Sequence, residues 1–328
     1  MRRREIVNLL IAAAAWPFAA RARPNGRIPV IGYLYPVSEA DDRQMGCAAA
    51  FREGLRDLGY VEGENLRIEA RYADRQFDRL KPLVAELVGL NVELIVTAGP
   101  GVLAAHGVTT KVPIVMAAYA DPVAMGIVES LSHPGGNVTG LSFFWPELQS
   151  KRLELIKDVH PSLTRVGLLL LGRSDSPANR IVLDMANGTA SKLKIELAPI
   201  AVAGAGEVER ALADAPGGPV GAFVLDDSPT FLEDSAIIAD VAQRRGLLSI
   251  GAPMFASAGG LLGYGVDFPP MWRRAATFVD KILNGAKPGD LPIEQATRFT
   301  TIINLKTATA LAIDIPPALL AGADEVIE

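Results

Sequence analysis

The residues best suited to hold a small solute lie in loops that follow predicted strands. Gly99-Pro100-Gly101-Val102 comes directly after the strand predicted at 92–98 and leads into a predicted helix. Glycines let the backbone approach a ligand closely, and the free N–H groups at the start of a helix attract anions. Gly99, Gly101 and Val102 are therefore candidates for binding a carboxylate. The alternative is an ordinary strand-to-helix turn, because an isolated G-x-G is a common pattern.

Two aspartates are candidates for pairing with a ligand ammonium group. Asp121 follows the strand predicted at 113–118, and Asp227 follows the strand predicted at 220–225. A charge pair shielded inside a closed cleft is stronger than the same pair in water. Each aspartate also has a structural alternative: Asp before Pro commonly forms a turn. Asp227 and its neighbour Asp226 are not distinguished by position, and either can cap the helix predicted to start near Pro229.

Other polar and aromatic side chains occur at strand ends or near three non-helical connections, where we expect the chain to cross between two lobes. These connections lie near 138–142, 262–267 and 290–294. Hydroxyl, carboxylate and amide groups follow the strand predicted at 166–171, where Ser176 can instead cap the next helix. Aromatic rings in such positions can stack on a ligand, although some of them are expected to be ordinary core residues. These further candidates are Tyr35, Tyr119, Ser142, Phe143, Ser174, Asp175, Asn179, Phe255 and Tyr264.

The sequence shows no recognisable arrangement for catalysis or metal binding. His106, His133 and His160 are the only histidines and lie far apart, without a metal-ligand spacing. There is no G-x-S-x-G motif and no pair of carboxylates at a familiar spacing. Cys47 is the only cysteine, which excludes a disulfide within the chain and a thiolate zinc site. We therefore predict no catalytic residues, no metal and no cofactor.

The first 22 residues have the pattern of a secretory leader. Arg2 to Arg4 form a positive start, 6–18 is a short apolar stretch, and Ala20-Arg21-Ala22 is a small-x-small cleavage pattern. The apolar stretch is shorter than the roughly 20 residues of a membrane-spanning helix. The alternative is an apolar N-terminal helix of a cytosolic protein. Residues 3–7 also resemble a twin-arginine export signal. We predict an exported, periplasmic protein cleaved near Ala22.

The overall charge argues against a nucleic-acid-binding protein. The 328-residue chain has a formal net charge of −5, and its leader is positively charged, so the remainder is more acidic still. Nucleic-acid binding depends mainly on Lys and Arg side chains that neutralise phosphates. No segment after the leader is long and apolar enough to span a membrane. We predict no nucleic-acid partner and no stable membrane insertion once the leader is removed.

Short apolar runs alternate with helical patterns along most of the chain. Nearly continuous apolar runs are typical of parallel strands that are covered on both faces. This alternation predicts an α/β fold with two Rossmann-like lobes and parallel sheets. The predicted strands are 28–35, 66–72, 92–98, 113–118, 138–143, 166–171, 195–202, 220–225 and 247–250. The predicted helices include 41–58, 77–88, 125–131, 148–159, 178–193, 229–245 and 270–283.

Several ordered motifs resemble those of a known family. The chain is similar to the ABC transporter substrate-binding proteins of the ABC sub-bind type in Asp121-Pro122-Val123, in 134–142 (PGGNVTGLS), in 259–267 (GGLLGYGVD), and in the segments 273–276, 281–285, 303–308 and 316–317. The resemblance covers essentially the whole chain. It implies a type I periplasmic-binding fold, three hinge crossings and a ligand in the cleft between the lobes. The best understood relatives bind amino acids, including aromatic ones. Many have Gly-Thr-Pro where this chain has Gly99-Pro100-Gly101, which removes a hydroxyl and an N–H.

These observations together predict a solute-binding protein of an ABC importer. The expected ligand is a small polar solute, an amino acid or related carboxylate, and the expected protein partner is an ABC permease. Two alternatives remain open: a ligand-sensing partner of a membrane receptor, and an exported α/β hydrolytic enzyme. The predicted division is a signal peptide at 1–22, an N-terminal lobe of 27–139 plus 266–291, and a C-terminal lobe of 140–265 plus 292–328.

Overall fold

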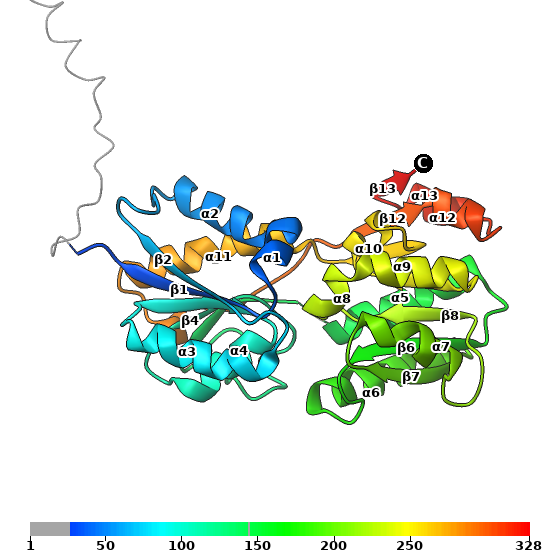
Figure 1. Cartoon of the computed structure of the whole chain (residues 1–328), viewed down its shortest axis with the longest axis horizontal. Coiled ribbons are helices and arrows are strands. Elements are labelled where there is room, and N and C mark those ends of the chain that lie inside the picture. The colour runs from blue at the N-terminus through cyan, green and yellow to red at the C-terminus, as the bar shows by residue number, and fades with distance from the viewer. Residues whose placement is uncertain (1–26, 144) are drawn as a thin grey trace, which may run out of the picture.

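The protein contains two α/β lobes, each built around its own sheet (Figure 1). A computed structural model describes residues 27–143 and 145–328, so the predicted leader at 1–22 lies outside the described residues. The first lobe has a six-stranded sheet in the order β11-β5-β4-β3-β1-β2, with all neighbours parallel. Its strands are β1 (Val30–Tyr35), β2 (Arg67–Tyr72), β3 (Leu94–Ala98), β4 (Ile114–Tyr119), β5 (Val138–Ser142) and β11 (Glu294–Gln295).

Helices cover both faces of the first sheet. In Figure 1, α2 and α11 lie on one side of the strands, and α3 and α4 lie on the other. The helices of this lobe are α1 (Glu39–Met45), α2 (Cys47–Asp57), α3 (Leu80–Gly89), α4 (Pro100–Val108) and α11 (Phe268–Leu283). This covering explains why the central strands are apolar on both sides.

The second lobe has a seven-stranded sheet in the order β13-β12-β10-β9-β8-β6-β7. Neighbouring strands in this sheet are parallel, except that β10 and β12 are antiparallel to each other. The strands are β6 (Arg165–Leu171), β7 (Glu196–Val202), β8 (Ala222–Leu225), β9 (Leu248–Gly251), β10 (Leu262–Gly265), β12 (Thr300–Asn304) and β13 (Glu325–Ile327). The helices are α5 (Trp145–Val159), α6 (Pro177–Lys192), α7 (Val208–Ala213), α8 (Pro229–Glu233), α9 (Ser235–Arg244), α10 (Pro253–Ser257), α12 (Leu305–Ala310) and α13 (Pro317–Ala321).

The predicted fold class is confirmed, but three predicted helices are wrong. The helix expected at 229–245 is α8 and α9, which are separated at Asp234. The helix expected at 41–58 is two helices, because Gly46 adopts φ +73° and its N–H bonds to the carbonyl of Asp42, which ends α1. The helix expected at 125–131 is a series of turns. There the Pro122 carbonyl accepts bonds from Ile127 and Val128, and Gly126 adopts φ +68°. Left-handed glycines favour such interruptions.

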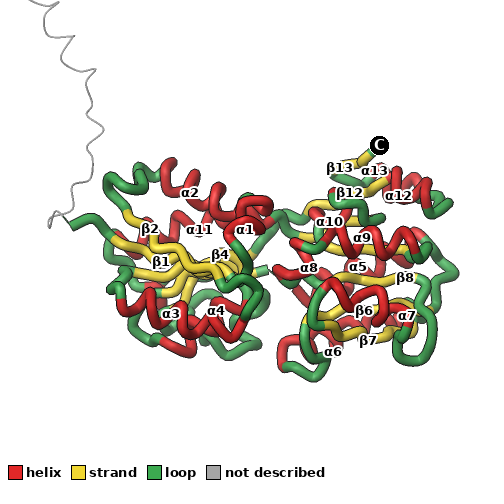
Figure 2. The backbone as a smooth tube through the Cα atoms, viewed as in Figure 1, coloured by secondary structure: helices red, strands yellow, loops and turns green. Residues whose placement is uncertain are grey.

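The chain passes between the sheets in three places, as the distribution of consecutive strands between the two sheets requires. Figure 2 shows loops between the two groups of strands. The passages lie between β5 and α5, between β10 and α11, and between β11 and β12. The first sheet extends to Ser142 and includes Glu294–Gln295, because β5 pairs with β4 and β11 pairs with β5. Residues 140–142 and 294–295, which we expected in the second lobe, therefore belong to the first sheet.

The core of the first lobe centres on Trp272 of α11. Its ring centroid lies 5.2 Å from the rings of both Tyr33 and Tyr35. The predicted apolar stripe of this helix is buried at Trp272, Ala276 and Val279. The second lobe has separate apolar clusters on its own sheet.

Among the helices of residues 27–143 and 145–328, none combines the length and the apolar character of a membrane span.

Candidate functional site

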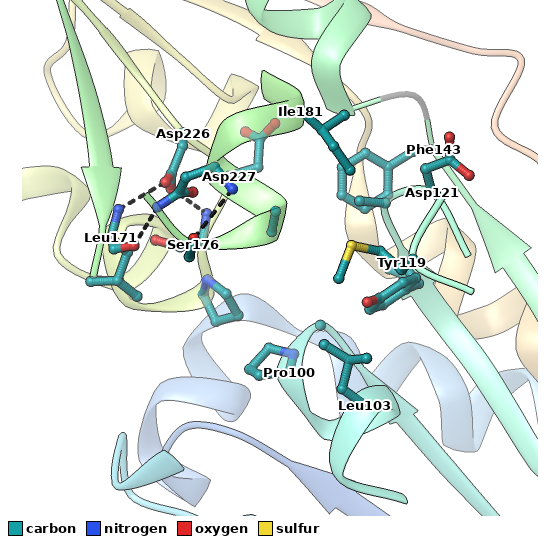
Figure 3. A pocket seen from close by; sticks show the side chains of 18 of the residues that line it. Pro100, Leu103, Tyr119, Asp121, Phe143, Leu171, Ser176, Ile181, Asp226 and Asp227 are labelled. Carbon is teal, nitrogen blue, oxygen red and sulfur yellow. Dashed lines mark hydrogen bonds between the residues drawn. The ribbon is translucent and has the colours of Figure 1, made fainter. Parts of the chain in front are cut away.

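A cavity of about 270 Å³ lies between the two lobes. Both sheets contribute to it through the loops at the carboxyl ends of their parallel strands, which is where doubly wound folds bind ligands (Figure 3). From the first lobe it is lined by Phe77, Gly99, Pro100, Leu103, Ala118, Tyr119, Ala120, Asp121, Met125 and Phe143. From the second it is lined by Pro146, Leu171, Ser176, Ala178, Asn179, Ile181, Asp226, Asp227, Ser228 and Pro229.

Six of the candidates named from the sequence line this cavity. They come from different strand ends, which shows how the fold collects residues that are far apart in the chain. These residues are Gly99, Tyr119, Asp121, Phe143, Asn179 and Asp227.

The loop before α4 brings backbone to the cavity, but it presents few N–H groups. Gly99 adopts φ +50° and ψ −131°, and Pro100 begins α4 without an N–H. The N–H of Val102 already bonds to the carbonyl of Gly99 at 3.0 Å. Gly101 packs against β3, since a Cβ there would lie 2.1 Å from Oγ1 of Thr97. Gly101 and Val102 therefore serve helix packing and do not line the cavity.

Asp121 lines the cavity and also closes a turn. Its Oδ1 accepts backbone hydrogen bonds from Val123 at 3.0 Å and Ala124 at 2.9 Å. This is the turn-forming role that the sequence left open for an Asp before Pro. One carboxylate oxygen is therefore engaged by the backbone. Among the described residues, Asp121 is the only acidic residue of the first lobe that lines the cavity.

Tyr119 places an aromatic ring and a hydroxyl at the end of β4. Figure 3 shows its ring on the same side of the cavity as Phe143 and Leu103. Burial raises the pKa of the Tyr119 phenol, and the nearby Asp121 carboxylate raises it further. The hydroxyl consequently stays protonated at physiological pH and can donate a hydrogen bond to a ligand.

Asp226 is held by the backbone of its own lobe. Its Oδ2 accepts from the N–H of Leu171 at 3.0 Å, and its Oδ1 accepts from the N–H of Ser228 at 2.7 Å (Figure 3). Burial raises the pKa of this carboxyl to about 6, although the same hydrogen bonds lower it. The side chain fixes the loop that carries Asp227 and Ser228 along the cavity wall.

Asp227 is paired with Arg152, a residue that the sequence analysis did not single out. Arg152 Nη2 lies 2.7 Å from Asp227 Oδ1, and the two side chains are 0% and 2% exposed. Arg152 also donates to the carbonyls of Leu225 at 2.9 Å and Tyr264 at 2.8 Å. Burial raises the pKa of the Asp227 carboxyl, and Arg152 opposes that shift. The negative charge of Asp227 is thus already balanced within the protein.

The remaining candidates do not line the cavity. Tyr35 and Phe255 are buried in the apolar clusters of their lobes, and Tyr264 stacks on Phe299 with ring centroids 6.0 Å apart. Ser142 is buried at the end of β5. Ser174 is partly exposed and does not line the cavity. Asp175 is exposed, and its Oδ2 lies 2.7 Å from Nη2 of Arg173. Side chains at strand ends thus divide between cavity, core and surface.

The side chains of the described residues contain no grouping suited to a metal ion. Within 27–143 and 145–328, no three or more His, Cys, Asp or Glu residues are close enough together to hold one. The acidic residues of the cavity instead bond to backbone N–H groups or to Arg152. The site is therefore suited to holding an organic solute through apolar contacts and a few hydrogen bonds.

A family model described as ABC transporter substrate binding protein matches residues 39–327. The chain belongs to this family. The resemblance noted in the sequence motifs is therefore confirmed over nearly the whole chain. A curated tyrosine-binding protein of Clostridioides difficile is 28% identical over 263 residues, which is 80% of this chain and 75% of that protein.

Solved structures share the fold of this substrate-binding protein. A Streptococcus pneumonia ABC domain in complex with L-Trp has a TM-score of 0.82 and 24% identity, covering 92% of this chain and 100% of that one. A conserved domain protein from Vibrio cholerae also has a TM-score of 0.82, at 25% identity and the same coverage. A leucine-binding protein LivK from Thermotoga maritima has a TM-score of 0.58 at 14% identity, covering 78% and 83%.

Sequence reasoning missed the apolar part of the site in this substrate-binding protein. It is formed by Phe77, Leu103, Met125 and Ile181. Leu103 and Ile181 lie in α4 and α6, Phe77 begins a 3-10 helix, and Met125 lies in the turns after β4. Nothing in the local pattern separates these residues from ordinary partly buried side chains. Arg152 had a detectable signal, because it replaces an apolar residue in the i, i+4 series of α5.

Proposed function

We propose that this substrate-binding protein is the extracytoplasmic component of an ABC importer and holds one small solute between its lobes. The observation that carries the proposal is the cavity, whose wall is divided between two lobes joined by only three chain passages. A solute that contacts both lobes binds the closed arrangement better than an open one. Binding therefore favours closure by that difference in affinity.

The proposed solute is an amino acid with an apolar or aromatic side chain. Phe77, Leu103, Met125, Phe143 and Ile181 form an apolar wall for such a side chain. The volume of about 270 Å³ lies just under the range of pockets for drug-sized ligands, which suits one amino acid. The names of the related proteins support this class, since one is a tyrosine-binding protein and another is in complex with L-Trp.

Within the cavity, we assign the ammonium group to Asp121 and a hydrogen bond to the Tyr119 hydroxyl. Gly99, Phe143 and Asn179 are the other contacts proposed from the sequence that also line the cavity. Asp227 is a weaker candidate for the ammonium, because Arg152 already neutralises its carboxylate. The start of α4 is a limited carboxylate site, because Pro100 has no N–H to offer.

The proposal includes export to the periplasm, delivery to a membrane permease and release of the solute unaltered. The leader pattern at 1–22 supports export. The family supports a transport role, since it consists of ABC transporter substrate-binding proteins. Among the described residues, no histidine, cysteine or lysine lines the cavity, and the carboxylates that line it are held by backbone N–H groups or by Arg152.

Thermal unfolding in the presence of each of the twenty amino acids tests the proposed function. A solute present at 100 times its dissociation constant adds about 2.7 kcal/mol to the unfolding free energy. We expect stabilisation by tyrosine, tryptophan or another apolar amino acid, and NMR should recover that amino acid unchanged. No stabilisation by any of the twenty, or the appearance of a reaction product, would contradict the proposal.

An Asp121→Asn variant tests the assignment of the ammonium group. Asn retains an oxygen that can accept from Val123 and Ala124, so the turn is preserved while the negative charge is lost. A hydrogen bond to a charged group contributes about 1.5–3 kcal/mol. We expect roughly tenfold or greater loss of affinity by calorimetry, with an unchanged melting temperature in the absence of solute. Unchanged affinity would move the ammonium site elsewhere.

A further inference from the structure

Arg75 of the first lobe reaches across to acidic residues of the second lobe. It lies in the loop after β2, where its backbone adopts φ +62° and its N–H bonds to the carbonyl of Pro36 at 2.9 Å. Its Nη1 lies 2.9 Å from both carboxylate oxygens of Asp234, and its Nη2 lies 2.7 Å from Oε2 of Glu233. Arg75 does not line the cavity. It therefore joins the two lobes without being placed to touch a solute.

A carboxylate of the first lobe, Asp41, completes what we call the interlobe ion cluster: Asp41, Arg75, Glu233 and Asp234. Asp41 Oδ2 lies 3.6 Å from Arg75 Nη2 and accepts a hydrogen bond from Ser38 Oγ at 2.5 Å. The side chains of Glu233 and Asp234 are only 3% and 13% exposed. Such pairs are screened less by water and salt than exposed surface pairs.

The α8 helix meets the first lobe at two other points. Leu232 is 3% exposed and belongs to the same buried apolar cluster as Val37 and Met45 of the first lobe. Pro229 approaches Gly99, where a Cβ would lie 3.7 Å from the proline ring. Figure 1 shows α8 at the edge of its lobe that faces α1. Each of these contacts joins residues of different lobes, so the contacts exist only while the lobes are together.

We propose that Arg75 is an affinity-determining residue outside the cavity, which latches α8 onto the first lobe and so holds the closed arrangement. This inference rests on the proposed function, since closure determines affinity only if a solute binds between the lobes. A residue that stabilises the closed form alone raises the fraction of molecules able to retain solute. It also holds the Asp226–Pro229 wall of the cavity, which leads directly into α8.

The interlobe ion cluster makes the latch dependent on pH. Glu233 faces Arg75 and Asp41 from the first lobe, its neighbour Asp234, and the ring of Tyr35. Burial raises the pKa of Glu233 to about 8; Arg75 lowers it, and Asp41 and Asp234 raise it. Opening would expose Glu233 to water, so its pKa would return toward the ordinary value of 4.5. The closed form thus holds the Glu233 proton more tightly, so the contribution of Glu233 to closure is complete below about pH 4.5 and is lost as pH rises through about 8.

Small-angle X-ray scattering of the solute-free full chain tests the latch. We expect Arg75→Met and Asp234→Asn, which remove the ion pair from opposite lobes, each to increase the radius of gyration. The exchanged pair Arg75→Asp with Asp234→Arg should restore the compact value. The matched control is Arg273→Met, because Arg273 of α11 pairs with Glu53 and Asp57 of α2 within the first lobe. Circular dichroism confirms that each variant is folded.

The same measurement across pH 5–9 tests the role of Glu233. The radius of gyration of the wild type should increase with pH, and Glu233→Gln should remove most of that increase. Two results would overturn the latch. One is a solute-free wild type that is already extended. The other is a compact wild type whose scattering curve superposes on those of Arg75→Met and Asp234→Asn. Because no solute enters the experiment, this result is independent of whether the amino-acid screen succeeds.

Discussion

Arg152 is a charged side chain with no exposed surface, placed on the apolar face of α5. Its bonds to Leu225, Tyr264 and Asp227 reach the end of β8, β10 and the cavity wall. A buried charge is tolerated only when it is paired and hydrogen-bonded. The pair therefore holds together the second-lobe side of the cavity and the end of the strand that leads to one passage between lobes.

Replacing Arg152 should destabilise the protein strongly. Arg152→Met leaves the Asp227 carboxylate buried without its partner, and breaking such a pair costs about 3–5 kcal/mol. Urea unfolding measures this loss, with Lys151→Met as the control, since Lys151 is the neighbouring exposed residue of the same helix. The loss should shrink at low pH, where Asp227 can be protonated, and in the double variant with Asp227→Asn. An unfolding free energy equal to that of Lys151→Met would show that the pair contributes no net stability.

At the scale of the element, α4 connects sequence pattern to site geometry. Its first turn must lie close to β3 so that Gly99 and Pro100 reach the cavity. Gly101 makes this approach possible, because any larger residue would meet Thr97 Oγ1 at 2.1 Å from its Cβ. The glycine that the sequence suggested for ligand binding is instead required for the fit between helix and strand.

Two alanine substitutions in α4 should therefore have opposite effects. Gly101→Ala forces an overlap with Thr97, and overpacking of this kind costs about 1–3 kcal/mol. Gly107→Ala, six residues later, has only the end of the Lys81 side chain within 4 Å. It should stabilise the helix by up to about 1 kcal/mol, because alanine is the better helix former. Thermal unfolding of both variants checks this, and equal effects would refute the packing argument.

At the scale of the whole molecule, buried acids of the second lobe make stability depend on pH. Burial raises the pKa of Asp226 to about 6 from an ordinary value of 3.8. The folded state therefore holds a proton more tightly than the unfolded chain. The contribution of Asp226 to stability is complete below about pH 3.8 and is lost as pH rises through about 6.

Substituting Asp226 isolates this contribution from that of other groups. Asp226→Asn removes the titrating carboxyl and with it this loss of stability. The unfolding free energy of the wild type minus that of the variant should therefore decrease as pH rises from 4 to 7. Urea unfolding at several pH values measures the difference. A difference that does not vary with pH would mean that Asp226 titrates alike in the folded and unfolded chains. Asp175, whose pKa is lowered by its hydrogen bond from exposed Arg173, offers a control site.

The strand–helix alternation, the family motifs and the α/β class were all predictable from the sequence. Local apolar periods indicate buried strands and helix faces because neighbouring residues alone determine which side of an element is apolar. Gly46 and Gly126 show the limit of that reasoning. Their positive φ values divide the predicted helix at 41–58 and replace the one at 125–131 with turns. A glycine's conformation depends on the hydrogen bonds available around it, which local periodicity does not encode.

The sequence by itself determined which loops approach the carboxyl ends of the strands, because alternation of strands and helices dictates that edge. Only the tertiary structure decided which of their side chains line the cavity. Asp227 pairs with Arg152, 75 residues away, and Arg75 pairs with Asp234, 159 residues away. Such partners meet only when the sheets are packed, since burial and charge pairing depend on distances in space and not on spacing along the chain.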